Sequence, residues 1–143
     1  MKENKEFLEQ VGTLASAFES TACTSVKMEK KTIELIVSGQ MPEGDVLSKA
    51  RIAGLLATRK SQEILPAVPP LADDAVKVSL IVRTADKVDI SVTAKSTTPD
   101  NASKASIMIA SMTALSLYNL CNPVDKEIEI GNVTSFSSEK KIA

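Results

Sequence analysis

The sequence contains no histidine, and aromatic residues make up only 3% of its 143 positions. Histidine is the commonest metal ligand and the commonest acid–base group near neutral pH. Its absence excludes Ser-His and Cys-His nucleophilic catalysis and zinc-dependent hydrolysis of the usual kind. An enzyme built from this chain would have to use carboxylates, lysine, tyrosine or cysteine.

An excess of one charge sign is also lacking, since 17 basic residues face 18 acidic ones. Nucleic acids and anionic membrane surfaces favour a basic face, so we expect neither as the main partner. Apolar runs long enough to cross a bilayer are absent, and residues 1–10 lack the apolar stretch of a secretion signal. We therefore expect a cytoplasmic protein. The two cysteines, Cys23 and Cys121, lie far apart and in no metal-binding spacing, which predicts reduced, structural thiols.

The residues that are present suffice for one folded domain. Hydrophobic residues make up 43% of the chain, and its length is typical of a single domain. We assign residues 21–143 to that domain. Residues 1–20 form a polar N-terminal segment that is either frayed or a short docked helix. The helix is suggested by four apolar residues that recur at helical spacing, namely Leu8, Val11, Leu14 and Phe18.

Alternating residues predict the strands. Residues 24–28 alternate, and so do residues 76–82 and 88–94, which are separated by a short turn around residues 84–86. The last two runs predict an antiparallel hairpin with one apolar face. Ile128 and Ile130 open a final strand.

Helix signals fill the segments between the strands. Residues 32–38 predict a short helix that ends at Gly39. Asp45 is placed to cap the start of a helix that runs to about Glu63. We expect a buried stripe on that helix and three cations on its sides. The stripe consists of Ile52, Leu55 and Leu56, and the cations are Arg51, Arg59 and Lys60. After this helix, prolines exclude regular helix from residues 65–70.

A long helix is predicted from the Thr98-Pro99-Asp100 opening to about Asn122, before Pro123. It is apolar on more than one side, so we expect one flank to pack on the sheet and the other on a second subunit. Tyr118 and Cys121 are predicted to be buried. The sum is an α+β fold in which two long helices cover one face of a four-stranded, mostly antiparallel sheet.

Three stretches together resemble molybdenum cofactor biosynthesis protein C (MoaC), the cyclic pyranopterin monophosphate synthase family. The first joins Gly-Asp-Val at residues 44–46 to Ala-Arg-Ile-Ala-Gly at residues 50–54. The second is the proline-rich run at residues 64–71. The third is the Leu-Ser-Leu-Tyr-Asn-Leu-Cys run at residues 115–121, followed by Val-Asp-Lys at residues 124–126. The resemblance spans about residues 21–135.

This resemblance implies a ferredoxin-like fold and a hexamer, built as a trimer of dimers with pockets at subunit contacts. It implies a lyase-type rearrangement of cyclised dihydro-GTP to a cyclic pterin monophosphate, with release of pyrophosphate. It implies no metal and no organic cofactor.

The sequence departs from the family pattern where the chemistry is expected. A lysine before Gly-Asp-Val is replaced by Glu43. The family's Cys-His-Pro-Leu falls on residues 68–71, and its glutamate pair falls on residues 103 and 105. An acid and a lysine near the end of the long helix are also replaced. The degenerate positions are Glu43, Val68, Pro69, Ser103, Ala105, Asn119 and Asn122.

Pro69, Ala105 and Asn119 cannot hold and release a proton. Losing one acid–base group typically removes about 10²- to 10⁴-fold in rate, and such losses do not add simply. A slip of the alignment within the helix would not restore the pair, because residues 102–121 contain no Asp or Glu.

Several polar residues keep two interpretations. Asp45 is either a pocket carboxylate or a helix cap, and Ser103 and Asn119 are either ligand contacts or plain polar residues. The remaining basic residues either hold an anion or are solvated, with their stems on apolar surface. These candidate anion-binding residues are Arg51, Arg59, Lys60 and Lys126.

Three functional hypotheses follow. The first is a degenerate homologue that binds a nucleotide or pterin, or serves as a structural or regulatory subunit. The second is an active synthase in which the four basic residues hold the phosphates. The third is a different enzyme on the same fold, since fold does not fix function.

Overall fold

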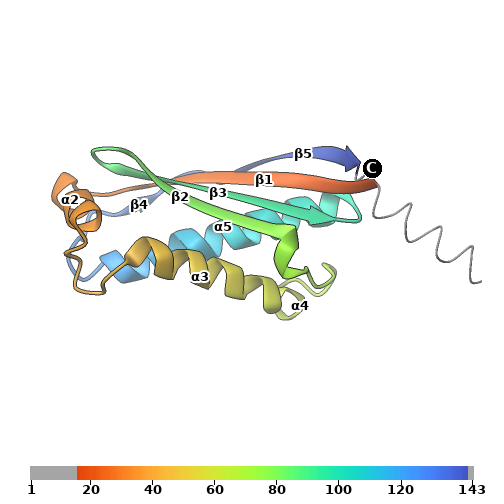
Figure 1. The fold of residues 1–143 in the computed structure, drawn as a ribbon, viewed down its shortest axis with the longest axis horizontal. Helices are drawn as coiled ribbons and strands as arrows, with labels where there is room; N and C mark the ends of the chain where they lie inside the picture. Colours follow the sequence, from red (N-terminus) through yellow and green to blue (C-terminus); the bar gives the residue numbers. More distant parts are fainter. Residues whose placement is uncertain (1–15, 142–143) are drawn as a thin grey trace, which may run out of the picture.

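One antiparallel sheet forms a layer, and the helices α3 and α5 form a second layer on one of its faces (Figure 1). The computed structural model describes the backbone of residues 16–141 and the side chains of residues 18–72 and 74–137. The strand order is β2-β3-β1-β4, and β5 also pairs with β1. This is the predicted α+β, ferredoxin-like arrangement. The elements are β1 (Ser16–Lys27), α2 (Lys30–Ser38), α3 (Val46–Arg59), α4 (Ser61–Ile64), η1 (Asp73–Ala75), β2 (Val76–Thr84), β3 (Lys87–Ser96), α5 (Pro99–Cys121), β4 (Glu129–Ile130) and β5 (Thr134–Lys141).

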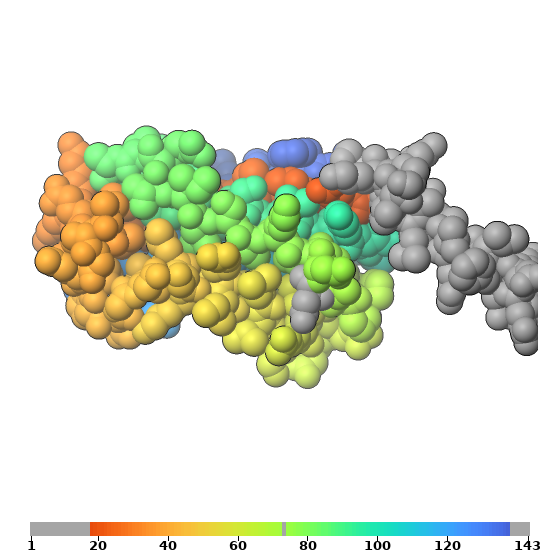
Figure 2. Space-filling model, viewed as in Figure 1, coloured from red at the N-terminus to blue at the C-terminus, as the bar shows by residue number. Residues whose placement is uncertain are grey.

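The β2–β3 hairpin confirms the prediction from alternation. Val78 pairs with Val92 and Leu80 pairs with Ile90. Val92 is fully buried and Ile90 is nearly so, because this face of β3 lies under the helices. In the space-filling view, the side chains of α3 lie directly below those of the hairpin (Figure 2).

Strand β1 begins earlier than predicted. It starts at Ser16, so Phe18 lies in the sheet and its assignment to a helical spacing is wrong. The residues that β1 directs toward the helices include Ser20, Ala22 and Thr24, all buried. Because these side chains are small or polar, the first half of β1 lacks the apolar alternation that identifies a strand. The other residues of that helical pattern lie outside the described residues.

The final strand is divided into β4 and β5, which both pair with β1, so the sheet formed by the described residues has five strands instead of four. Gly131 lies at the break. Its N–H donates to the Ser25 carbonyl at 2.8 Å, and its own carbonyl accepts from Thr24 Oγ1 at 3.1 Å. At this point the Thr24 hydroxyl, instead of a backbone N–H, donates to the Gly131 carbonyl. Regular pairing with β1 resumes at Thr134.

Helix α3 buries its small residues against α5, and the predicted apolar stripe is wrong. Ala50, Gly54 and Ala57 are buried, and a Cβ built on Gly54 would lie 2.1 Å from Thr113 Oγ1. The two helices thus approach so closely that no side chain fits at Gly54. The large residues consequently point outward, with exposed fractions of 57% for Ile52, 36% for Leu55 and 52% for Leu56.

Helix α5 begins and ends where the sequence predicts. Thr98 Oγ1 accepts the Asn101 N–H at 3.1 Å, and Cys121 is the last helical residue and is fully buried. The predicted burial of Tyr118 is wrong, since 37% of it is exposed. Tyr118 shares the exposed side of the helix with three large apolar residues, namely Ile107, Met112 and Leu115. No helix within residues 16–141 is long and apolar enough to cross a membrane.

Candidate functional site

The loop before α3 carries the first of the family positions. Glu43 is exposed, and its carbonyl accepts from Lys49 Nζ. Asp45 caps α3 by accepting from the Ser48 hydroxyl at 2.7 Å and the Ser48 N–H at 3.2 Å. The Ser48 hydroxyl, the Ser48 N–H and the nearby Arg51 charge lower the pKa of Asp45. The structure thus supports the cap interpretation of Asp45.

The connection between α4 and β2 holds the second group of family positions. Val68 is fully buried in the core, and its N–H donates to the Leu65 carbonyl at 2.9 Å. Pro69 is exposed beside it. Neither side chain can donate, accept or transfer a proton, so these two positions offer apolar shape and no acid–base chemistry.

A seam of hydroxyl groups lies where the first half of α5 meets β1 and β5. Ser103 Oγ is 3.0 Å from Ser135 Oγ. Ser106 Oγ donates to the Ser103 carbonyl at 2.9 Å and lies 3.3 Å from Ser20 Oγ. Ala105 is fully buried. The positions that match the family's glutamate pair therefore hold a neutral hydrogen-bonding group and a methyl group.

The end of α5 carries the remaining degenerate positions. Asn119 is exposed. Asn122 Oδ1 accepts from Lys126 Nζ at 3.3 Å, so Lys126 lies beside the C-terminal end of α5.

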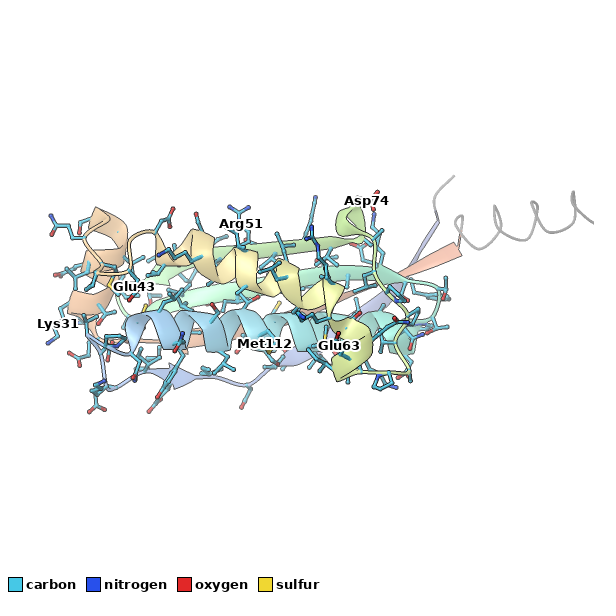
Figure 3. The ribbon with its side chains drawn as sticks, turned by 90° about the horizontal axis from the view of Figure 1, so that it is seen from below. Lys31, Glu43, Arg51, Glu63, Asp74 and Met112 are labelled. Atoms are coloured by element: carbon cyan, nitrogen blue, oxygen red, sulfur yellow. The ribbon has the colours of Figure 1, made fainter. Side chains whose placement is uncertain are left out.

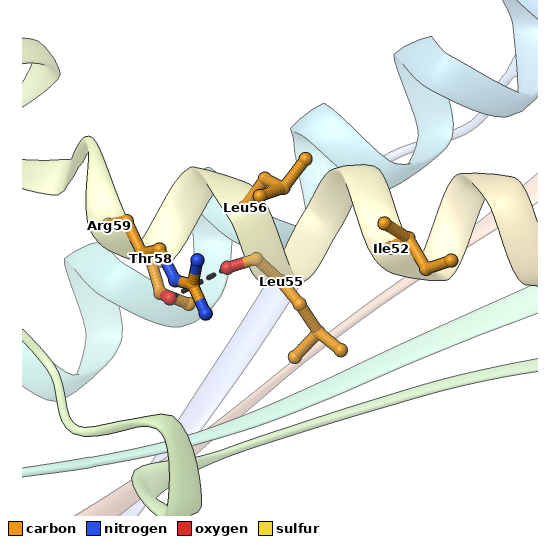
Figure 4. A pocket seen from close by; sticks show the side chains of 5 residues that line it. All are labelled: Ile52, Leu55, Leu56, Thr58 and Arg59. Atoms are coloured by element: carbon orange, nitrogen blue, oxygen red, sulfur yellow. Dashed lines mark hydrogen bonds between the residues drawn. The ribbon is translucent and has the colours of Figure 1, made fainter.

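The four candidate anion-binding residues do not converge within one chain. Arg51 lines a polar hollow of about 240 Å³ between α3 and β2, and Figure 3 shows it pointing away from α5. Arg59 lines a separate apolar hollow of about 320 Å³ on α3 (Figure 4). Lys60 follows at the end of α3. Because α3 and α5 run in opposite directions, Lys126 lies at the far end of the helix layer.

Asp125 is a buried carboxylate to which the sequence analysis assigned no role. It is 1% exposed, and Oδ2 accepts from the Glu29 N–H at 2.9 Å and from Thr32 Oγ1 at 2.7 Å. Oδ1 accepts from the Glu127 N–H at 2.8 Å. Burial opposes the charge, but these three hydrogen bonds and Lys31 lower the pKa of Asp125. Asp125 thereby ties the loop after α5 to the start of α2.

The cysteines fit structural roles. Both are free thiols. Burial, reinforced by the nearby Asp125 charge, raises the pKa of Cys121 to about 11. A thiol with that pKa stays protonated at neutral pH and is a poor nucleophile. Across the described part of the chain, no group of three His, Cys, Asp or Glu residues is arranged to hold a metal ion.

Comparisons with known proteins identify the family. The MoaC family model matches residues 13–140. The cyclic pyranopterin monophosphate synthase of Roseiflexus sp. (strain RS-1) is 32% identical over 117 residues, covering 80% of this chain and 73% of that protein. The cyclic pyranopterin monophosphate synthase 3 of Mycobacterium bovis is 31% identical over 112 residues, covering 78% of this chain and 63% of that protein.

A solved structure, the designed protein Foldit4, aligns over 87% of this chain and 99% of its own, at 10% identity and a TM-score of 0.34, which is too low to bear on fold or function. The family assignment depends instead on the sequence matches, which cover most of the chain at more than 30% identity. The chain belongs to the MoaC family.

Proposed function

We propose that this chain is a MoaC-family homologue without synthase activity, which binds a nucleotide or pterin ligand or serves as a structural or regulatory subunit. Membership in the MoaC family implies involvement in molybdenum cofactor biosynthesis. The observation that carries the proposal is the replacement of ionisable groups by Ser103, Ala105 and Asn119. Ser103 is in contact with Ser135 and Ala105 is fully buried, so neither position holds an ionisable group.

A synthase needs groups that move protons and cations that face the phosphates. Each missing acid–base group typically removes about 10²- to 10⁴-fold in rate. Glu43 adds a negative charge where the family has a lysine, which opposes an anionic substrate. The hydroxyl seam around Ser103 can still donate and accept hydrogen bonds, as a pterin ring or a nucleotide base requires.

The alternative function is an active synthase that converts cyclised dihydro-GTP to cyclic pyranopterin monophosphate. In that case the phosphates would be held by Arg51, Arg59, Lys60 and Lys126. These residues lie on separate parts of one chain, so a second subunit would have to bring them together. The third hypothesis, a different enzyme on the same fold, lacks a new constellation of side chains within residues 18–137.

Pyrophosphate release on mixing the purified protein with cyclised dihydro-GTP tests the proposal. We expect no release above the uncatalysed rate, while an ordinary family member releases pyrophosphate under the same conditions. Release at a rate near that of the control would refute the loss of activity. Titration calorimetry with the same precursor then tests whether the protein still binds the ligand that it does not convert.

We also propose that the chain assembles as a homo-oligomer, in line with the hexamer of the family, and that a second copy packs on the outer flank of α5. Ile107, Met112, Leu115 and Tyr118 are all more than one-third exposed on this flank. Contiguous apolar surface of this kind on a folded domain commonly marks an interaction site.

Charge on this flank should weaken the assembly. We expect Leu115→Glu to shift the chain to a smaller species in light scattering coupled to size exclusion, because a carboxylate would be desolvated at the contact. The matched control is Ile81→Glu, since Ile81 is 47% exposed on the open face of the sheet and Leu115 is 51% exposed. An unchanged mass for Leu115→Glu would place the contact elsewhere.

A further inference from the structure

The outer edge of β2 is open beside the polar hollow that it shares with α3. Strand β2 stands at the end of the order β2-β3-β1-β4, and no segment within residues 16–141 pairs with its other side. Three successive residues of the strand line the hollow, namely Val78, Ser79 and Leu80. Neighbouring side chains of a strand point to opposite faces, so the hollow must run along the edge to meet all three. An edge of this kind presents backbone N–H and C=O groups that have no partner strand.

The apolar layer under the sheet is also incomplete along this edge. On β3, Ile90 and Val92 are almost fully buried, but their partners on β2, Leu80 and Val78, are only half-buried. Leu47 on α3 lines the same hollow and is half-buried as well. A strand added beside β2 would direct every second side chain toward these residues. The edge therefore fits an extended segment with apolar residues at alternate positions.

The charge beside the edge favours an acidic segment. Arg51 lines the hollow and points away from α5 (Figure 3), and it makes no hydrogen bond or ion pair with any residue that the structure describes. The nearby Asp45 accepts two hydrogen bonds from Ser48 instead. Lys77, which is exposed on β2, adds a second cation. A carboxylate on the incoming segment would thus meet a guanidinium that is available for a charged hydrogen bond.

A second copy of the chain fits this edge less well. If two β2 edges met in antiparallel fashion around Ser79, the two-fold axis would pass close to Arg51 and bring two guanidinium groups together. Like charges at close range oppose such a pairing. Charged residues on edge strands commonly prevent self-association in this way. The same cations leave the edge open to a segment of opposite charge.

We propose that the β2 edge and its hollow bind an extended, acidic segment of another protein as an added strand. The register of β2 with β3 is regular over residues 76–82, which gives the segment an unbroken edge. Backbone hydrogen bonds to β2 supply affinity, and side-chain contacts supply preference. Apolar residues of the segment cover Val78 and Leu80, and a carboxylate pairs with Arg51.

Binding of a capped, fluorescein-labelled peptide to the full-length chain, followed by fluorescence anisotropy, tests the proposal. The peptide Glu-Thr-Val-Thr-Val-Thr-Glu reads the same in both directions and places its valines and glutamates on one face of a strand. We expect saturable binding with a Kd below about 1 mM, and slower amide hydrogen exchange within residues 76–82. Absence of saturable binding in that range, or protection confined to other residues, would overturn the proposal.

A backbone-methylated peptide separates strand addition from other modes of binding. Methyl groups on the amide nitrogens of the threonines and valines leave every side chain in place but remove the donors that β2 needs. We expect binding at least about tenfold weaker, because main-chain hydrogen bonds supply the affinity in strand addition. Equal binding of the two peptides would show that the edge of β2 is not used.

Reversal of charge tests the role of Arg51. Arg51→Glu should weaken binding of the glutamate peptide about fivefold, the scale of one exposed ion pair. It should also favour a peptide in which lysine replaces glutamate. Lys104→Glu is the matched control, because it makes the same change of charge on α5, and it should leave the preference unchanged. Circular dichroism verifies that each variant is folded.

Two further outcomes would overturn the proposal. An equal effect of Arg51→Glu and Lys104→Glu would show that the peptide responds to net charge and not to Arg51. Protection of the β2 amides that appears without peptide and increases with protein concentration would assign the edge to a second copy of the chain.

Discussion

The substitution Gly54→Ala should lower the free energy of unfolding by about 2 kcal/mol, the usual cost of forcing an extra methyl group into a packed interior. In most helices the same change raises stability by about 1 kcal/mol. The sign reverses here because the new methyl carbon would lie 2.1 Å from Thr113 Oγ1 and 3.5 Å from Ile109 Cγ2. Thr113 is fully buried and donates to the Ile109 carbonyl at 2.7 Å, so it cannot easily move away.

A second substitution isolates this contact. Thr113→Ala removes the colliding oxygen, so Gly54→Ala should become neutral or stabilising in that background. Thr113→Val is the matched control, because its methyl group occupies the place of Oγ1 and should give no relief. Urea unfolding at one fixed protein concentration measures each stability, with an unchanged slope showing that the transition is comparable. If Gly54→Ala stabilised the chain whatever residue occupied position 113, the close approach of α3 and α5 would be refuted.

The same contact explains where the sequence misled the prediction. The stripe of Ile52, Leu55 and Leu56 has the helical spacing of a buried face, and hydrophobicity alone favours it. The decisive signal was the row of small residues at Ala50, Gly54 and Ala57. Such a row lets two helix backbones approach closely, but it identifies a partner only when that partner's position is known.

Local signals, in contrast, predicted the elements they directly control. The hairpin follows from alternation, and the start of α5 follows from the Thr98 cap, because both depend on residues close in sequence. The first half of β1 could not be predicted from local sequence, because its buried Ser20 accepts a hydrogen bond from Ser106 on α5, 86 positions away. The candidate site has the same difficulty. Its positions could be named through a family resemblance, but their separation over both ends of the helix layer is a property of the fold.

Asp125→Ala should cost about 3 kcal/mol of stability, because it leaves buried donors without their charged acceptor. The three donors are the Glu29 N–H, the Thr32 hydroxyl and the Glu127 N–H. The first two donors lie more than 90 residues from Asp125 in sequence, so the loss should be felt in the whole fold. The matched control is Asp89→Ala, which removes a half-exposed carboxylate bonded to Ser25 and Arg83. That surface change should cost at most about 1 kcal/mol.

The stability that Asp125 contributes should depend on pH in one direction. Its pKa in the folded chain lies below the ordinary value, so the unfolded chain takes up a proton first as the pH falls. The contribution is fully present above the unfolded pKa of about 3.9, and it is lost as the pH drops through the folded pKa. The stability difference between the natural chain and Asp125→Asn should therefore be largest near pH 7 and shrink toward pH 3. Chemical unfolding of both chains across this range measures it, and a difference that stayed constant or grew toward low pH would show that the buried carboxylate is not held in its charged form.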